Sequence, residues 1–235
     1  MSILAIETAS QVSSVAVLKE GRLAAEITMQ GRLTHSETLM PHVKSVLQMA
    51  GTEQRDVSGI AVSIGPGSFT GLRIGLAAAK AMAYAWDVPL VGISTLDVLA
   101  MHFPVPGVTV LPIIDAQKGN AYTAPFLFSD GAMQAHAAIA VKPIEQILEE
   151  VGQLKEEVIL LGDAVRKIKK DAALPAHVHL APAHMRMPRA ACVAMLGAMR
   201  LSRGEADNVM NLEPVYIRRS EAEVLWEKRQ REAGK

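Results

Sequence analysis

Hydrophobic residues recur along this chain in two spacings. Short apolar runs rich in β-branched residues are typical of buried strands, and apolar residues every three or four positions are typical of helices that cover a sheet. In the first half these patterns predict strands at residues 2–8, 12–18, 23–29, 60–64 and 89–93. They predict helices at residues 34–50, 70–86 and 94–100.

The second half repeats this order. Strands are predicted at residues 108–115, 120–128, 133–141, 157–161 and 177–180, and helices at 144–151, 164–170 and 188–202. The chain is thus β-β-β-α-β-α-β-α twice over, and such a duplication implies two similar α/β lobes. We expect an N-terminal lobe at 1–103, a C-terminal lobe at 104–219, and a charged tail helix at 220–235 that carries Trp226.

Residues 60–86 combine a strand, a glycine-rich turn and a long helix. The turn can offer backbone N–H groups to an anion at a helix N-terminus. The helix is apolar nearly all round, so it must be covered on more than one side. Small residues recur at every fourth position, namely Gly71, Gly75, Ala79 and Ala83. We expect one side of this helix to pack on its own sheet and the small-residue row to admit a partner helix.

Composition narrows the class of protein. Half of the 235 residues are hydrophobic, and 24 Lys and Arg balance 24 Asp and Glu, which disfavours a stand-alone nucleic-acid-binding module. Cys192 is the only cysteine, which suits a reducing cytosol. Glu7 interrupts the N-terminal apolar run, and Arg73 and Lys80 interrupt the most apolar segment, so neither a signal peptide nor a membrane span is expected. We expect a cytoplasmic protein.

Each predicted lobe opens with a strand that ends in a carboxylate, Glu7 in the first and Asp115 in the second. Proteins of the actin-like, sugar-kinase and Hsp70 group hold Mg-ATP between two such strands. The candidate nucleotide-binding residues are Glu7, Thr8, Gly65, Gly67, Ser68 and Asp115. No glycine follows Glu7, however, and the turn lacks the Gly-Lys-Ser/Thr ending of a P-loop. A nucleotide-dependent kinase or ATPase is therefore the alternative function.

Metal and nucleophilic catalysis are not supported by the pattern. His35 and His42 lie about 10 Å apart along one predicted helix, too far to share an ion. His177 and His179 share a strand face, but no carboxylate or cysteine lies near them in sequence. Cys192 lies among alanines and methionines and has the setting of a core thiol. We predict no catalytic residue and no metal site.

Five segments of the chain form a distinctive set, namely Gly65-Pro66-Gly67-Ser68-Phe69-Thr70-Gly71-Leu72-Arg73-Ile74-Gly75, Leu4-Ala5-Ile6-Glu7-Thr8-Ala9, His35-Ser36-Glu37-Thr38-Leu39-Met40-Pro41, Gly92-Ile93-Ser94-Thr95-Leu96 and Pro214-Val215-Tyr216-Ile217-Arg218. Through these segments the chain strongly resembles the TsaB (YeaZ) family over about residues 2–219. At Asp115-Ala116-Gln117 the chain departs from the family's Asp-Ala-Arg, since Gln117 replaces the arginine.

The resemblance implies an actin-like (ribonuclease H-like) fold and a non-catalytic paralogue of TsaD. TsaD transfers a threonylcarbamoyl group to the adenosine next to the anticodon of ANN-reading tRNAs, and TsaB-like proteins work with TsaD and the ATPase TsaE. TsaD carries a His-x-x-x-His metal pair, whereas His35 is followed here by Leu39, so peptidase activity is not expected. The one cofactor to consider is ATP or ADP at the junction with TsaD. Contact with tRNA would be indirect.

The partner surface is predicted on helices 34–50 and 70–86. Its candidate residues are His35, Leu39, Met40, Val43, Leu72, Gly75, Leu76, Ala79 and Met82. The same surface would face a second copy of the chain when TsaD is absent, giving an isologous homodimer.

Overall fold

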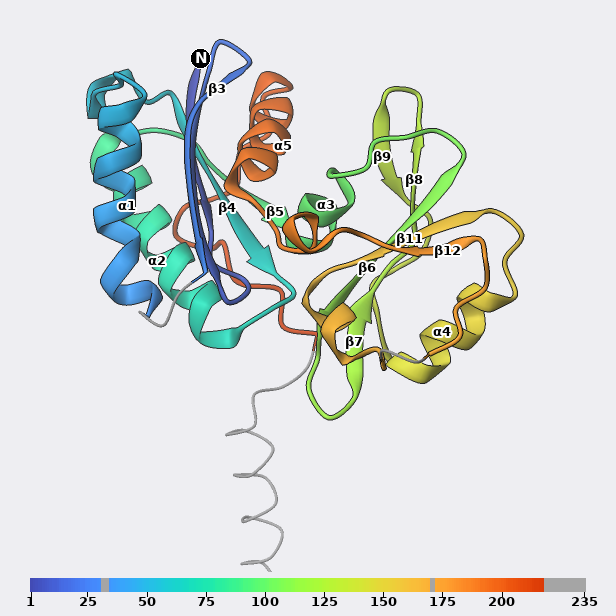
Figure 1. The fold of residues 1–235 in the computed structure, drawn as a ribbon. Coiled ribbons are helices and arrows are strands. Elements are labelled where there is room, and N and C mark those ends of the chain that lie inside the picture. Colours follow the sequence, from blue (N-terminus) through green and yellow to red (C-terminus); the bar gives the residue numbers. More distant parts are fainter. Residues whose placement is uncertain (31–33, 170–171, 218–235) are drawn as a thin grey trace, which may run out of the picture.

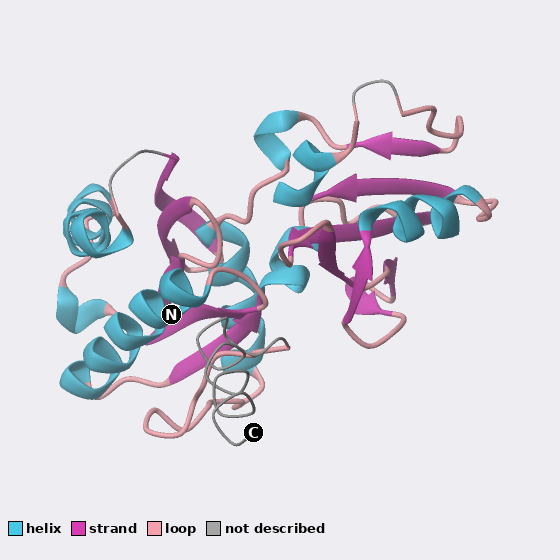
Figure 2. Ribbon diagram, turned by 90° about the horizontal axis from the view of Figure 1, so that it is seen from below, coloured by secondary structure: helices cyan, strands magenta, loops and turns pink. Residues whose placement is uncertain are grey.

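The computed structural model describes residues 1–30, 34–169 and 172–217, which form two α/β lobes (Figures 1 and 2). The first half contains β1 (Ser2–Glu7), β2 (Val12–Lys19), β3 (Arg22–Gln30), α1 (His35–Met49), η1 (Gln54–Asp56), β4 (Gly59–Gly65), α2 (Phe69–Trp86), β5 (Leu90–Ser94) and α3 (Thr95–Ala100). The second half contains β6 (Val108–Asp115), β7 (Asn120–Thr123), β8 (Phe126–Ser129), β9 (Ala132–Ala135), β10 (Ala140–Pro143), α4 (Ile144–Gly152), β11 (Glu157–Leu161), η2 (Asp163–Lys167), β12 (Val178–Leu180), η3 (Ala183–Met185) and α5 (Ala190–Ser202).

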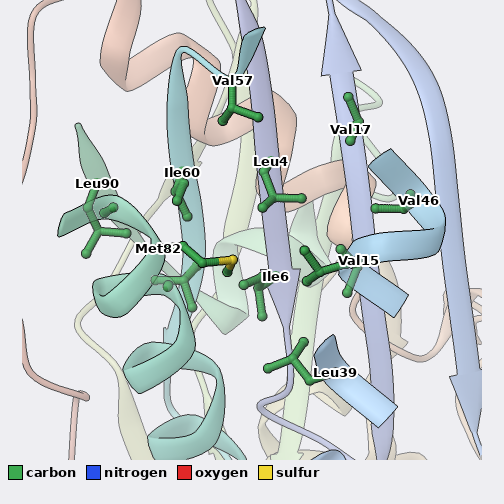
Figure 3. Packing of buried hydrophobic residues seen from close by; sticks show 14 of the residues in the cluster. Leu4, Ile6, Val15, Val17, Leu39, Val46, Val57, Ile60, Met82 and Leu90 are labelled. Atoms are coloured by element: carbon green, nitrogen blue, oxygen red, sulfur yellow. The ribbon is translucent and has the colours of Figure 1, made fainter. Parts of the chain in front are cut away.

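The first sheet has the order β3-β2-β1-β4-β5 and is covered by helices on both faces (Figure 1). β1 pairs antiparallel with β2 and parallel with β4, so it lies in the middle of the sheet. Leu4 and Ile6 point into the core beneath α1 and α2 (Figure 3), whereas Ile3 and Ala5 pack beneath α5. This alternation explains why the strand is apolar at every position up to Glu7.

The second sheet repeats the arrangement. Within the described residues its main path is β10-β7-β6-β11-β12, with the first three strands antiparallel and the last two parallel to β6. α4 covers one face, where Ile144 and Ile147 meet Leu160. α3 contributes Leu96 and Leu99 to the core on the other face and so links the lobes. The predicted internal duplication is confirmed by this common strand order.

Two predicted strands of the second lobe were wrong in their extent. Residues 120–128 form β7 and β8, because Pro125 has no N–H to donate to the ladder with β6. Residues 133–141 form β9 and β10. Phe126 pairs with Ala135, whereas Thr123 pairs with Ala140. The connection between β9 and β10 therefore holds two more residues than the connection between β7 and β8.

Two helices of the second half differ from their predictions. The predicted helix 164–170 is only a short 3-10 turn, η2, because the backbone at Ile168 is extended and ends it. α5 follows the second sheet in sequence but packs on the first, where Gly197 lies against Ala61 of β4. The boundaries 1–103 and 104–219 stay a prediction, and the predicted tail helix 220–235 with Trp226 lies outside the described residues.

Helix starts followed their sequence signals more closely. The Glu37 carboxylate accepts the Thr34 N–H at 2.9 Å, as a capping box requires. Ser68 and Ser94 are the N-caps of α2 and α3. Among the described residues no helix is long and apolar enough to cross a membrane.

Candidate functional site

A cleft of about 520 Å³ lies where the two lobes meet. The turn after β1 and the β4–α2 turn form its first-lobe wall, through Ser10, Gln11, Gly67 and Ser68. Asp115, Asp163 and Arg166 form its second-lobe wall. Residues 215–217 close one side. The cleft therefore lies at the carboxyl ends of β1 and β6, where two-lobed α/β folds commonly place ligands.

The β4–α2 turn is occupied by a protein group. The Ser68 N–H donates to the Ala9 carbonyl at 2.7 Å. The Ser68 side chain accepts the Gly71 N–H at 3.3 Å, and its carbonyl accepts the Leu72 N–H at 2.9 Å. The Ser68 and Gly71 N–H groups are two of the donors that the start of α2 could offer an anion, whereas the Leu72 bond is the first hydrogen bond of the helix itself. Phe69 and Thr70 of the same turn line the cleft.

The glycines of this region are required by the chain itself. A Cβ added at Gly67 would overlap the Ala9 carbonyl, and one added at Gly71 would overlap the Thr8 carbonyl. A Cβ at Gly75 would overlap the Thr8 hydroxyl. The Thr8 hydroxyl also donates to the Gly71 carbonyl at 2.8 Å. At Gly71 and Gly75 the small-residue row thus lets α2 approach the end of β1.

Glu7 is fully buried beneath the cleft and does not line it. Its carboxylate accepts the Ala9 N–H at 2.6 Å and the Ser63 hydroxyl of β4. Burial raises the pKa of Glu7 to about 7, against the opposing effect of the two hydrogen bonds. The carboxylate is enclosed by protein groups that tie β1, β4 and the next turn together.

Asp115, the corresponding acid of the second lobe, is held by two cations. The Lys167 ammonium lies 2.6 Å from the carboxylate and the Arg166 guanidinium 3.4 Å from it. Burial alone would raise the pKa of Asp115, but hydrogen bonds from Lys167, the Gln117 N–H and Arg166 hold it below its usual value. Arg166 also donates to Gln11 at 3.2 Å, so it bridges the cleft from one lobe to the other.

The C-terminal segment, residues 208–217, crosses the first lobe beside α2. Lys80 donates to the carbonyls of Met210 and Leu212 at 2.9 and 3.1 Å. Arg73 lies 3.8 Å from the centre of the Phe69 ring and donates to the Tyr216 hydroxyl at 2.9 Å. These contacts carry residues 215–217 to the mouth of the cleft.

Known proteins resemble the chain along most of its length. The family model described as "TsaD: tRNA N6-adenosine threonylcarbamoyltransferase" matches residues 29–226. Two relatives, from Bacillus subtilis and Escherichia coli, carry the name "tRNA threonylcarbamoyladenosine biosynthesis protein TsaB". Each is 32% identical to this chain, over 96% and 97% of it respectively and 98% of each relative. The chain belongs to the TsaB family.

Solved structures agree with the assignment to the TsaB family. YeaZ from Pseudomonas aeruginosa has a TM-score of 0.79 and 27% identity, covering 92% of this chain and 99% of that one. The activator of 2-hydroxyisocaproyl-CoA dehydratase from Clostridium difficile, solved with bound ADPNP, has a TM-score of 0.52 and 12% identity over 88% of this chain and 99% of that one. The latter likeness shows the fold alone. The predicted family and the predicted two-lobed actin-like fold are confirmed.

Of the six nucleotide-site residues predicted for this TsaB-family chain, only three line the cleft. Gly67, Ser68 and Asp115 do so. Glu7 and Thr8 are fully buried, and Gly65 is buried beneath Leu72 and the Val215 carbonyl. A role for the six residues in binding a nucleotide stays a prediction.

The predicted partner residues are divided by burial. Seven of them lie in the core of the first lobe or against β1, namely Leu39, Val43, Leu72, Gly75, Leu76, Ala79 and Met82. His35 is half-buried and contacts the Ser10 carbonyl through its ring nitrogen at 2.9 Å. Met40 is 51% exposed. A bulky charged side chain at Gly75 or Ala79 would therefore disturb the packing of the first lobe itself, whether or not a partner is bound.

The sequence prediction missed the residues that surround Asp115. Arg166, Lys167 and Asp163 follow β11, which lies parallel to β6. Residues just after neighbouring parallel strands gather at one edge of the sheet, and this signal could have placed them near Asp115. Within the described residues no group of three or more His, Cys, Asp or Glu could hold a metal ion. Burial raises the pKa of the Cys192 thiol to about 11.

Proposed function

We propose that this chain is a non-catalytic subunit in the threonylcarbamoylation of the adenosine next to the anticodon of ANN-reading tRNAs. It acts by binding and supporting TsaD together with TsaE. Membership of the TsaB family supports the pathway, since the named relatives are tRNA threonylcarbamoyladenosine biosynthesis proteins. The subunit role is supported by the chain's own geometry.

The observation that carries the proposal is the closed β4–α2 turn. The Ala9 carbonyl accepts the Ser68 N–H, and carbonyl oxygen is a poor neighbour for phosphate because both carry negative charge. Glu7 is enclosed by Ser63 and Ala9, which leaves its carboxylate no open side toward the cleft. The first lobe thus has its own groups on the Ser68 N–H and on the Glu7 carboxylate, which supports a binding role more than a catalytic one.

The partner surface that we propose is the outer face of α1 and α2. Its exposed apolar side chains are Met40 on α1 and Ala77, Ala81 and Tyr84 on α2. Tyr84 is 78% exposed, and large exposed apolar side chains on neighbouring helices are typical of docking surfaces. Without TsaD the same face would pair with a second copy around a two-fold axis.

The alternative, a nucleotide-dependent kinase or ATPase, is favoured only by the cleft. Its volume of about 520 Å³ suits a nucleotide, and Gly67, Ser68 and Asp115 line it. ATP or ADP could also bind there once TsaD completes the wall. The purified chain alone, assayed for ATP turnover, separates the two functions because only the alternative predicts turnover.

The direct test is reconstitution. Unmodified ANN-reading tRNA is incubated with TsaD, TsaE and the threonylcarbamoyl-adenylate synthase, with and without this chain, and the modified adenosine is quantified by mass spectrometry. We expect modification only when the chain is present. Equal modification without it would contradict the proposal.

A further inference from the structure

Three ion pairs near the junction of the two lobes have a buried carboxylate and an exposed cation. The Asp115 side chain is 7% exposed, whereas its partners Arg166 and Lys167 are 49% and 30% exposed. The Glu26 side chain is 5% exposed, whereas its partner Arg189 is 48% exposed. Because the cations of these pairs reach the solvent and the carboxylates do not, the surface that they form is positive.

The other ion pairs among the described residues lack this difference in exposure. Arg203 and Glu205, at the far end of α5, are 58% and 42% exposed. Lys142 and Glu150, on the second lobe, are 33% and 46% exposed. In such pairs both charges reach the solvent, so they largely cancel at the surface.

Arg166 and Arg189 lie at the edge of the first sheet that faces the second lobe. Arg166 of η2 donates to Gln11, in the turn before β2, at 3.2 Å. Arg189 immediately precedes α5, whose first N–H donates to the Ser14 hydroxyl of β2 at 3.0 Å. Gln11 and Ser14 are three residues apart, so the two arginines are anchored roughly 10 Å apart along this strand.

Two further cations lie close to these arginines in sequence. Lys169 is exposed two residues after η2. Arg186 belongs to the segment 181–189, which crosses from β12 of the second lobe to α5 on the first (Figure 1). Its Nε donates to the Ala181 carbonyl at 2.6 Å. We call these five cations the basic rim, namely Arg166, Lys167, Lys169, Arg186 and Arg189.

Exposed acids of the second lobe lie at the opposite end of β11. Glu156 and Glu157 are exposed at the start of this strand, whereas Arg166 and Lys167 follow its end. A strand of this length spans about 17 Å, so opposite charges mark its two ends. The zero net charge of the chain therefore conceals a local excess of positive charge, which composition alone does not show.

The arginines of the basic rim are suited to binding phosphate. A guanidinium group carries five N–H donors in a planar fork that matches phosphate oxygens. Within the described residues Arg189 contacts Glu26 through Nη2 and Arg186 contacts Ala181 through Nε, so each fork keeps donors for a ligand. Anchoring by these protein groups also reduces the rotamer entropy that binding would cost. Sugar-phosphate chains present such anions at regular intervals.

We propose that the basic rim binds the sugar-phosphate backbone of the tRNA. This inference rests on the proposed function, which brings tRNA to the complex, and it makes direct a contact that the family resemblance implied to be indirect. Backbone contacts fix the position of the RNA and carry no sequence information. The basic rim therefore orients tRNA without selecting its anticodon.

The test measures binding apart from catalysis. The full chain, alone and mixed with TsaD, is titrated into a fluorescein-labelled ANN-reading tRNA and followed by fluorescence anisotropy between 50 and 200 mM salt. We expect Arg189→Gln and Lys169→Glu each to weaken binding about three- to tenfold, and the slope of log K against log salt to fall by about 1 for each. A tRNA that does not read ANN codons should be affected equally, since the contacts are to the backbone.

Matched controls separate the basic rim from general charge effects. Arg203→Gln is matched to Arg189→Gln, because the charge of Arg203 is compensated by an exposed carboxylate. Lys155→Glu is matched to Lys169→Glu, because Lys155 is exposed beside the acidic end of β11. Both controls should change the affinity less than twofold. Arg166→Lys keeps the charge and should keep the salt slope, so a folding defect can be recognised.

Three results would overturn the proposal. They are no binding of tRNA at 50 mM salt, equal effects of the rim variants and their controls, and loss of co-elution with TsaD in the rim variants while their tRNA affinity is unchanged. The last result would assign the basic rim to an acidic protein surface instead. Because binding is measured without modification, it stays decisive if reconstitution shows that the chain is dispensable, and that outcome would contradict the proposed function alone.

Discussion

Glu7 and Asp115 end equivalent strands of the two lobes, yet their surroundings give them opposite chemistry. Glu7 has lost all contact with water, and burial raises its pKa to about 7. Asp115 keeps a cationic neighbour on each side, and its pKa lies below the usual value despite burial. The sequence identified both acids from the strand ends. It could not show the direction of either pKa shift, because burial by the folded chain raises the pKa of Glu7, and a hydrogen bond from the distant Lys167 lowers that of Asp115 against its own burial.

Glu7 should make the protein less stable as the pH rises. Its pKa is about 7 in the folded chain and 4.5 in the unfolded chain, so its contribution is complete below pH 4.5 and is lost as the pH rises through 7. That loss amounts to roughly 2–4 kcal/mol of unfolding free energy. Urea unfolding at about pH 5 and pH 8 should show a smaller decrease for Glu7→Gln than for the original chain. The exposed Glu149→Gln is the control, and an identical decrease in all three proteins would rule out this protonation.

The α2 helix shows what an apolar pattern can and cannot predict. The run of small and apolar residues predicted a helix at 70–86, and the structure has one at Phe69–Trp86. The pattern did not predict which partner required the small residues. Gly71 and Gly75 face Thr8, more than sixty positions earlier in the chain, and such a close approach leaves no mark on the local sequence. The exposed stripe of α2 is instead the one with Ala77, Ala81 and Tyr84.

Gly71→Ala should destabilise the first lobe although alanine favours helices. The new Cβ would overlap the Thr8 carbonyl, and overpacking of this kind costs about 1–3 kcal/mol. Ala81→Gly, on the exposed side of the same helix, should cost only about 1 kcal/mol through helix propensity. Both are measured by thermal unfolding. A Gly71→Ala protein of unchanged stability that has lost TsaD would instead place the glycine row at the partner interface.

The C-terminal segment should loosen when Arg73 is replaced. Arg73→Ala removes both the contact with the Phe69 ring and the hydrogen bond to Tyr216, whereas Tyr216→Phe removes only the latter. We expect amide hydrogen exchange in residues 211–217 to accelerate clearly in Arg73→Ala and slightly in Tyr216→Phe. Arg55→Ala is the control, because Arg55 forms an ion pair with Glu53. Equal exchange in all variants would mean that other contacts hold the segment.

At the scale of the whole molecule, the repeated order of strands and helices was enough to predict two similar lobes. The repeated order did not predict which elements of one half of the chain pack on the other lobe. α5 is encoded after the second sheet but covers the first, because its small residues, Gly197 among them, fit closely on β4. The break at Pro125 was visible in the sequence as a residue unsuited to a ladder, but its consequence for β9 and β10 depends on pairing.

The outer face of α1 and α2 can be tested without disturbing the core. Met40→Glu combined with Tyr84→Glu places two charges on exposed positions and should abolish co-elution with TsaD while leaving the circular dichroism spectrum unchanged. Met195→Glu is the matched control, because Met195 is exposed on α5 across the first sheet. If the control loses TsaD and the double variant keeps it, the partner binds the opposite face.

The measurement that bears most directly on the subunit role is reconstituted tRNA modification with these variants in place of the original chain. We expect Glu7→Gln and Asp115→Asn to support TsaD-dependent modification, because the proposed subunit role needs no chemistry from either carboxylate. We expect Met40→Glu with Tyr84→Glu not to support it, because TsaD would no longer be bound. Modification that is lost in well-folded Glu7→Gln or Asp115→Asn, and retained in the double variant, would contradict the proposed subunit role.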